Sequence, residues 1–259
     1  DRVAPFSDLL DTTGLYLRGG YDHVGEVITL NFADGPLDLV LFPFLDPQGA
    51  PDDFGVTTNN TITPPINGNS HHDNVEVDGY VNINSDDLSD VLIARRRART
   101  HESVLADAIN MATNHLRSPR SIAVAHAFVM GSLTTDSERQ LSVGGTGEVP
   151  SSLFDPFSYT ALGHLHRPQT AGSDVIRYSG TPIPYSFSEE HQKTVVNISL
   201  APNGAVTTEL IPVDVGRRVR TITGSMSELL DPSRFHDATD CFVRAVIEDQ
   251  QRILDPIAK

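Results

Sequence analysis

Three histidines stand where the sequence predicts that two buried strands end. The apolar run Ser121–Val129 predicts a buried strand that carries His126 near its carboxyl end. A second apolar run, Phe157–Leu162, leads into His164 and His166. Side chains two residues apart point the same way in extended backbone, so His164 and His166 can face one pocket. Neutral imidazoles are ligands for Zn²⁺, Mn²⁺ and Fe²⁺, and three that converge make half of a binuclear metal site.

Taken singly, each of these histidines is better explained by a structural role than by metal binding. Gly163 directly precedes the His-x-His pair, where it permits a close approach of the backbone and any unusual φ at the end of the strand. We expect Leu165, between the two histidines, to turn back towards the core.

The elements that position these residues alternate between strands and helices. Runs of β-branched and apolar residues predict strands at 15–19, 24–32, 37–44, 121–129, 157–162, 193–200, 205–213, 218–223 and 241–248, with a strand and turn at 176–184. Asp34-Gly35 predicts a hairpin turn, and Pro43 ends the following strand or places it at an edge. The region 88–117 predicts a helix, with Thr100 as the cap of its clearest part and Ser118-Pro119 as its end.

The acidic residues are concentrated in one part of the chain. The 259 residues hold 19 Lys and Arg against 34 Asp and Glu, a net charge of −15. Between Arg18 and Arg95 there are thirteen acids and no base, so this stretch carries −13 and the rest only −2. Much of it reads as an acidic insertion at about 46–87. Net charge therefore does not exclude DNA binding, since Arg95–Arg99 and Arg217–Arg220 lie outside that stretch.

Several classes of protein find no support in the sequence. A single cysteine, Cys241, forms no internal disulfide, which favours a reducing cytoplasm. No apolar run approaches about 18 residues, so we expect no membrane span. A phosphate-binding loop, a serine-hydrolase elbow and a cysteine metal motif are also absent.

Four motifs share their order and spacing with one family. The chain resembles the SbcD-type nuclease subunits of the bacterial DNA double-strand-break repair complex, within the calcineurin-like metallophosphoesterase superfamily. The resemblance covers about residues 88–230, and 1–46 more loosely. The most specific motifs are ALGHLH at 161–166 and YSGTPIPYSF at 178–187. The segments that carry it are Ala125–Gly131, Asp136–Arg139, Tyr159–Gln169 and Arg177–Phe187, followed by Lys193.

The resemblance implies ligands for two Mn²⁺ ions, with Mg²⁺ or another divalent metal as an alternative. His126 and His164 would bind one metal and His166 the other. The family's remaining ligands, and its catalytic histidine, belong to D-x-H, G-D and G-N-H-D motifs that are absent here, so no catalytic residue is assigned. Asp1-Arg2 resembles the residues after G-N-H-D. We therefore expect the chain to begin within the family sequence and to be weak or inactive as a nuclease by itself.

The resemblance also implies a fold and a cellular setting. The fold class is α/β, a metallophosphoesterase-type sandwich of two sheets flanked by helices, followed by the start of a small α/β capping domain. Residues 1–213 would form the nuclease domain, with the insertion at 46–87, and 214–259 would begin the capping, DNA-binding domain. The implied partners are DNA, an SbcC-type ATPase with coiled-coil arms and a second copy in a homodimer. The implied location is the cytoplasm, at the nucleoid.

The expected function is that of a metal-dependent DNA exonuclease and endonuclease subunit in double-strand-break repair and recombination. Arg139, Arg177 and Lys193 are candidate phosphate contacts. Ser137 and Glu138 either shape the entrance for DNA or hold an ordered loop. Two alternatives stay open, a phosphodiesterase or phosphatase for small nucleotides and a non-catalytic fragment that clamps DNA or assists assembly.

Overall fold

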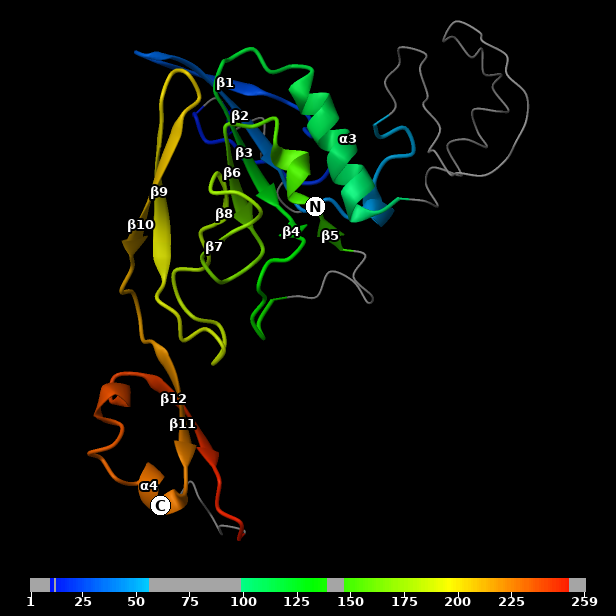
Figure 1. Ribbon diagram of the computed structural model, residues 1–259. Coiled ribbons are helices and arrows are strands. Elements are labelled where there is room, and N and C mark those ends of the chain that lie inside the picture. Colours follow the sequence, from blue (N-terminus) through cyan, green and yellow to red (C-terminus); the bar gives the residue numbers. More distant parts are fainter. Residues whose placement is uncertain (1–9, 12, 56–98, 139–146, 252–259) are drawn as a thin grey trace, which may run out of the picture. The chain divides into compact units, whose positions relative to one another are not determined.

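The computed structural model describes residues 10–11, 13–55, 99–138 and 147–251 (Figure 1). The chain divides into two compact units, one formed by residues 1–27 and 41–116 and the other by residues 28–40 and 117–259. The predicted start of a capping domain near residue 214 stays a prediction. Within the described residues, no helix combines the length and apolarity needed to cross a membrane.

A six-stranded mixed sheet organises the second unit, and its strands lie side by side in Figure 1. In spatial order they are β1 (Ile28–Phe32), β2 (Gly35–Phe42), β3 (Ser121–His126), β6 (Tyr159–Gly163), β8 (Ile176–Tyr178) and β7 (Gln169–Thr170). The three strands β3, β6 and β8 run parallel, whereas β1 with β2 and β7 with β8 are antiparallel. Parallel neighbours bring their carboxyl ends to one edge, where His126 and the His-x-His segment follow.

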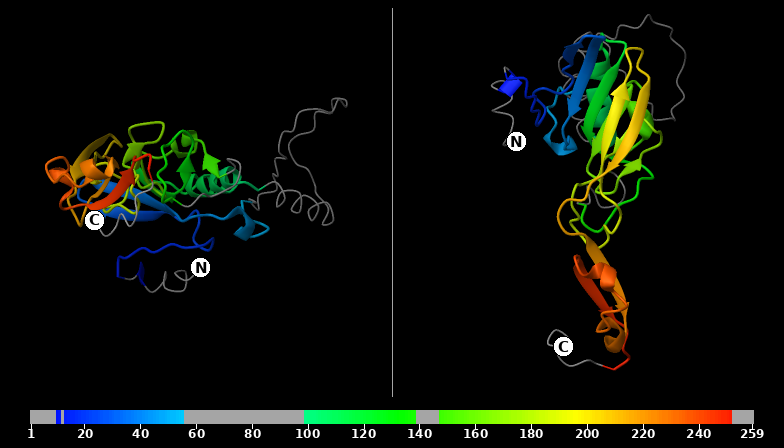
Figure 2. Two further views of the ribbon diagram at one scale, coloured as in Figure 1. Left: turned by 90° about the horizontal axis from the view of Figure 1, so that it is seen from below. Right: turned by 90° about the vertical axis from the view of Figure 1, so that its left-hand side faces the viewer.

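Three two-stranded sheets accompany this sheet. Antiparallel β9 (Thr194–Leu200) and β10 (Val206–Pro212) form a ribbon that Figure 2 shows from two sides. The parallel pairs are β4 (Phe128–Val129) with β5 (Glu148–Val149), and β11 (Val219–Gly224) with β12 (Phe242–Ile247). Short helices complete the unit, namely η3 (Ser151–Phe154), α4 (Met226–Leu229) and η4 (His236–Ala238). The mixed α/β class is confirmed at this level.

The hairpin signal and most strand predictions are confirmed. Phe32 and Gly35 face each other across the predicted turn, and β2 ends at Phe42, directly before Pro43. The strand predicted at 15–19 is wrong. Arg18 in that segment folds its guanidinium back onto the Asp11 carboxylate at 2.7 and 2.8 Å, a local loop contact that the apolar pattern did not reveal.

The described residues of the first unit include a long helix, α3 (His101–Thr113), and a short one, η2 (Pro47–Gly49). Thr100 caps α3 as predicted: its side chain accepts from the backbone N–H of Ser103, and the Ser103 hydroxyl accepts from that of Thr100. The part of the predicted helix at 88–98 lies outside the described residues. Of the arginine run 95–99, only Arg99 is described, and it donates to the carbonyls of Ala50 and Asp52. Those bonds give Arg99 a structural role.

Arg120 ties together distant parts of the second unit. This side chain is only 4% exposed, and its guanidinium is bidentate on Asp34 at 2.7 and 2.9 Å. It also donates to the carbonyls of Gly35, Pro36 and Leu200 at 2.8 to 3.0 Å. One buried cation thus joins the β1–β2 turn, the start of β3 and the end of β9.

Candidate functional site

Two of the three predicted ligands lie next to each other. His126 ends β3 and is paired in register with Gly163 at the end of the parallel strand β6. His164 follows directly, and the rings of His126 and His164 approach edge to face with 5.2 Å between their centroids. The ring of Phe128 lies 5.8 Å from that of His164. The register of two parallel strands is therefore what brings these imidazoles together.

The backbone after β6 bends in a way that the sequence did not predict. The unusual φ falls on His164, at 112°, and not on Gly163. A side chain in that region is strained, and such strain is found most often at functional sites. Leu165 is 2% exposed, so it does turn into the core as predicted. A Cβ on Gly163 would lie 3.4 Å from Nδ1 of His126, in van der Waals contact.

His166 is held through its backbone and its ring. Its backbone N–H donates to the Glu138 carboxylate at 2.8 Å, and its carbonyl accepts from the N–H of Thr181 at 3.2 Å. Ring atom Nδ1 lies 3.0 Å from Oε1 of Glu189 and 2.8 Å from Oγ of Ser137. Ser137 and Glu138, two residues of the predicted Asp136–Arg139 motif, therefore both contact His166.

Glu189 is the buried anion of this cluster. The residue is 2% exposed, and Lys193 Nζ donates to its Oε2 at 2.6 Å. Burial alone would raise the pKa of Glu189, but hydrogen bonds from Lys193, Ser137 and His166 outweigh it and lower the pKa to about 2. Glu189 is therefore a carboxylate at neutral pH.

His126 and His164 differ from His166 in what surrounds them. Burial lowers the pKa of His126, and burial together with the neighbouring His126 lowers that of His164. Both imidazoles are thus uncharged at neutral pH, which is the form that binds a metal ion. Imidazole is a ligand that divalent transition metals take, so the three histidine side chains suit such a metal in their chemistry, but they are not gathered into one metal-binding group. Among the described residues, no group of three or more His, Cys, Asp or Glu is arranged to hold a metal ion.

The three predicted phosphate contacts have different outcomes. Arg139 lies outside the described residues. Arg177 lies half-buried in the middle of β8, opposite Ala161, and its buried Nε has no hydrogen-bond partner among the described residues. Lys193 is 6% exposed, and its ammonium is bound to Glu189 and to the Thr181 hydroxyl. Burial and the ion pair give no support to a phosphate contact by Lys193, and that contact stays a prediction.

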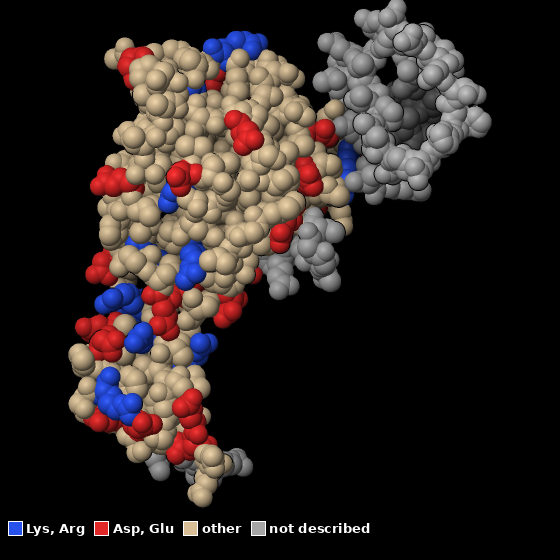
Figure 3. All heavy atoms as spheres, in the orientation of Figure 1, with Lys and Arg blue, Asp and Glu red and all other residues tan. Residues whose placement is uncertain are grey.

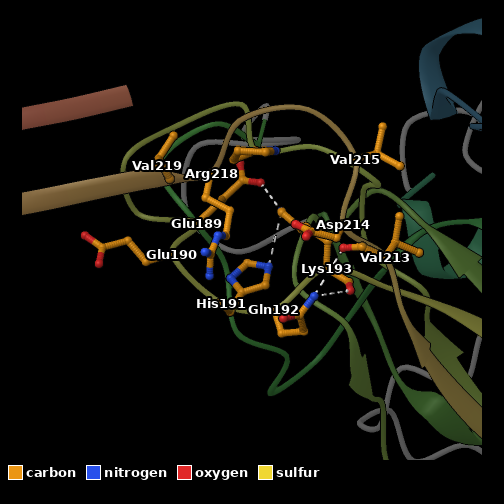
Figure 4. A pocket seen from close by; sticks show the side chains of 11 residues that line it. Glu189, Glu190, His191, Gln192, Lys193, Val213, Asp214, Val215, Arg218 and Val219 are labelled. Carbon is orange, nitrogen blue, oxygen red and sulfur yellow. Dashed lines mark hydrogen bonds and ion pairs between the residues drawn. The ribbon is translucent and has the colours of Figure 1, made fainter. Parts of the chain in front are cut away.

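A small hollow lies beside the ion pair of Glu189 and Lys193 (Figure 4). His191, Gln192, Asp214 and Arg218 are among the side chains that line it. Its volume is about 50 Å³, which admits a few water molecules but no nucleotide.

The surface charge shown in Figure 3 is mixed. Basic and acidic side chains alternate among neutral ones, and on this face the described residues form no continuous basic surface. Contacts with DNA therefore gain no support from this view.

Sequence reasoning missed two residues of the site, Glu189 and Tyr178. The Tyr178 hydroxyl donates to the carbonyl of Ala127 at 2.7 Å and accepts from the N–H of Val129 at 2.9 Å, which fixes the chain just after His126. Both residues stand within or just after the motif at 178–187. That motif was therefore a usable signal, although it did not show which atoms would meet.

A scan against models of known protein families finds no model that matches this chain.

Proposed function

We propose that this chain carries the histidine half of a two-metal phosphodiesterase, as a member of the SbcD-type nuclease subunits with the metallophosphoesterase fold. The observation that carries the proposal is the pair His126 and His164, placed side by side by two parallel strand ends and kept neutral by burial. His166, held by an ionised carboxylate, stands two residues further along.

The residues of this chain would act as ligands and as supports for ligands. His126 and His164 would hold one divalent cation and His166 a second. When bound, such a pair of cations activates water and offsets the charge of the phosphate. The chain itself supplies uncharged imidazoles and the carboxylates of Glu138 and Glu189 that fix the position of His166.

The substrate, the partners and the setting belong to the same proposal. We take duplex DNA as the substrate, an SbcC-type ATPase and a second copy as partners, and the nucleoid as the site of action. The hollow beside Glu189 is too small for a nucleotide and so gives no support to the alternative of a small-nucleotide phosphodiesterase.

Titration of Mn²⁺ into the purified chain tests the proposal most directly. We expect weak binding that falls at least about tenfold in His126→Ala, His164→Ala and His166→Ala. His115→Ala is the matched control, since His115 is an exposed histidine at the end of α3 whose ring bonds the Met111 carbonyl. Equal binding in all four variants, or none in the wild type at millimolar Mn²⁺, would refute the proposal.

An activity assay then separates the substrates. The 259-residue chain is compared with a version to which D-x-H, G-D and G-N-H-D motifs have been added upstream. Each is given linear duplex DNA, bis-p-nitrophenyl phosphate and cyclic nucleotides with Mn²⁺. We expect cleavage of duplex DNA by the extended version only. Turnover of cyclic nucleotides without DNA cleavage would favour the small-nucleotide alternative.

A further inference from the structure

We propose that Glu189 is a positioning residue that fixes the tautomer and the direction of the His166 ring, so that Nε2 is the nitrogen offered to a metal ion. The inference rests on the proposed function, and it deepens it by assigning a role to a buried ion pair that the resemblance did not supply.

The neighbours of the His166 ring decide which of its nitrogens carries the hydrogen. A neutral imidazole carries one N–H and one lone pair, and the partner of one nitrogen decides which it is. Oε1 of Glu189 lies 3.0 Å from Nδ1, and an ionised carboxylate can only accept. Nδ1 must therefore carry a hydrogen, so in the neutral ring the lone pair lies on Nε2.

Ser137 is the second neighbour of Nδ1, and its hydroxyl lies 2.8 Å from that atom. A hydroxyl has a single hydrogen, and this one donates to Oε1 of Glu189. Ser137 is then left to accept from Nδ1. Both neighbours of Nδ1 are acceptors, so they favour the same tautomer.

Lys193 holds the carboxylate of Glu189 in place. Lys193 Nζ lies 2.6 Å from Oε2 and also donates to the Thr181 hydroxyl at 3.1 Å. Neither side chain has room to turn towards solvent, since they are 0% and 7% exposed for Glu189 and Lys193. With Oε1 committed to Ser137 and His166 and Oε2 to Lys193, Glu189 serves as a support for a ligand and not as a ligand itself.

The backbone of His166 limits how its ring can turn. The backbone of His166 is fixed independently, through Glu138 on its N–H and Thr181 on its carbonyl. With the backbone fixed and Nδ1 bonded, the direction of Nε2 is determined. Buried carboxylates in contact with a ligating histidine commonly raise metal affinity in this way.

The test measures the tautomer of His166 in the metal-free chain by two-bond ¹H–¹⁵N correlation spectra of the histidine rings. We expect the Nδ1–H form in the wild type and its loss in Glu189→Gln, whose carboxamide is no longer obliged to accept. Glu190→Gln is the matched control, because that adjacent carboxylate binds Thr221 and Arg220 instead of His166. In a variant that stays folded, a purely structural role of Glu189 would not move the tautomer.

Mn²⁺ titration of the same variants supplies the second readout. We expect Glu189→Gln to lower the affinity about 10- to 100-fold and Glu190→Gln to leave it unchanged. If Glu189→Gln does not fold, the double variant Glu189→Gln/Lys193→Met removes both buried charges and is measured in its place.

The outcomes separate this inference from the proposed function. An Nε2–H tautomer in the wild type, or Mn²⁺ affinity that is unchanged in Glu189→Gln, overturns the inference and leaves the proposed function standing. An Nδ1–H tautomer that depends on Glu189 in a chain that binds no Mn²⁺ supports the hydrogen-bond assignment and refutes the metal function.

Discussion

The histidines at the two strand ends are held by different physical means. Hydrogen bonds hold His166, through Glu138 and Thr181 on its backbone and Ser137 and Glu189 on its ring. Burial and ring contacts are prominent around His126 and His164, and the His166 ring has one ring contact as well, with Tyr185 at 5.2 Å between centroids. A hydrogen-bonded ring depends on single atoms, whereas a packed ring depends on volume and on the path of the backbone. The two regions should therefore respond to different substitutions.

The largest loss of stability should come from removing Lys193, the cation of the hydrogen-bonded cluster around His166 and Glu189. Lys193→Met leaves Glu189 as a buried charge without its partner, and we expect a loss of about 3–5 kcal/mol in the free energy of unfolding. Arg220→Met is the control, because Arg220 pairs with Glu190 and Asp237 at the surface and should cost less than about 1 kcal/mol. Urea unfolding of both variants measures the difference. Equal losses would show that Glu189 does not depend on Lys193.

The turn at Gly180 packs against the backbone carbonyl of His166. Gly180 has φ +76°, and a Cβ there would lie 2.7 Å from the carbonyl oxygen of His166. We expect Gly180→Ala to cost about 3 kcal/mol, from the backbone conformation and the collision together. Gly131 has the same φ with open space around it, so Gly131→Ala should cost only about 1–2 kcal/mol. Thermal unfolding of the two variants isolates the collision, and identical melting temperatures would contradict it.

The Tyr178 hydroxyl forms two buried hydrogen bonds to the backbone just after His126. Tyr178→Phe keeps the ring but leaves the carbonyl of Ala127 and the N–H of Val129 without this partner in the interior. We expect a loss of about 1–3 kcal/mol. Tyr185→Phe, at a residue 64% exposed, should change stability little. Denaturant unfolding gives both values, and a Tyr178→Phe chain as stable as the wild type would count against the role given to this hydroxyl.

The φ of His164 should decide which substitution the packed pair of His126 and His164 tolerates better at residue 164. Glycine at 164 should be more stable than alanine by about 1 kcal/mol, because φ 112° strains any residue with a Cβ. In an ordinary helix the order is the reverse. Measured unfolding free energies of His164→Gly and His164→Ala decide the question. If alanine proves the more stable, the backbone at this residue is not strained.

The smallest effect should be one of pH. Burial lowers the pKa of His126 and His164 below the usual 6.5, so below that pH the unfolded chain binds more protons than the folded one. Stability should then fall as the pH drops through about 6.5. His101 and His191 have pKa values lowered in the same direction, so the informative quantity is the difference from His126→Gln/His164→Gln. An equal slope in both chains would contradict the prediction.

Local signals predicted the elements that carry the histidines. The Asp34-Gly35 turn, the stop at Pro43 and the cap at Thr100 each depend on neighbours in sequence, and each is confirmed. The contact of Glu189 with His166 joins residues 23 apart, on either side of β7 and β8, and no local pattern in the sequence predicts it.

Two further features of the site were not displayed by the sequence. Lys193 was a candidate phosphate contact, and in the structure its ammonium is buried against Glu189. The unusual φ was expected at Gly163, and it falls on His164 instead, next to the buried Leu165. The burial of Lys193 against Glu189 is a tertiary contact, which a single sequence does not display.

Arg120 has a consequence for the order of folding. Its guanidinium reaches acceptors 80 and 86 residues away, so its bonds form only after β1, β2, β3 and β9 have met. Contacts between residues so distant in sequence are made after loops have closed. We expect Arg120 to contribute little in the transition state for folding, so that Arg120→Met mainly accelerates unfolding and leaves the folding rate nearly unchanged. The hydrogen bonds of Arg120 would then set the unfolding rate, and with it the lifetime of the folded state.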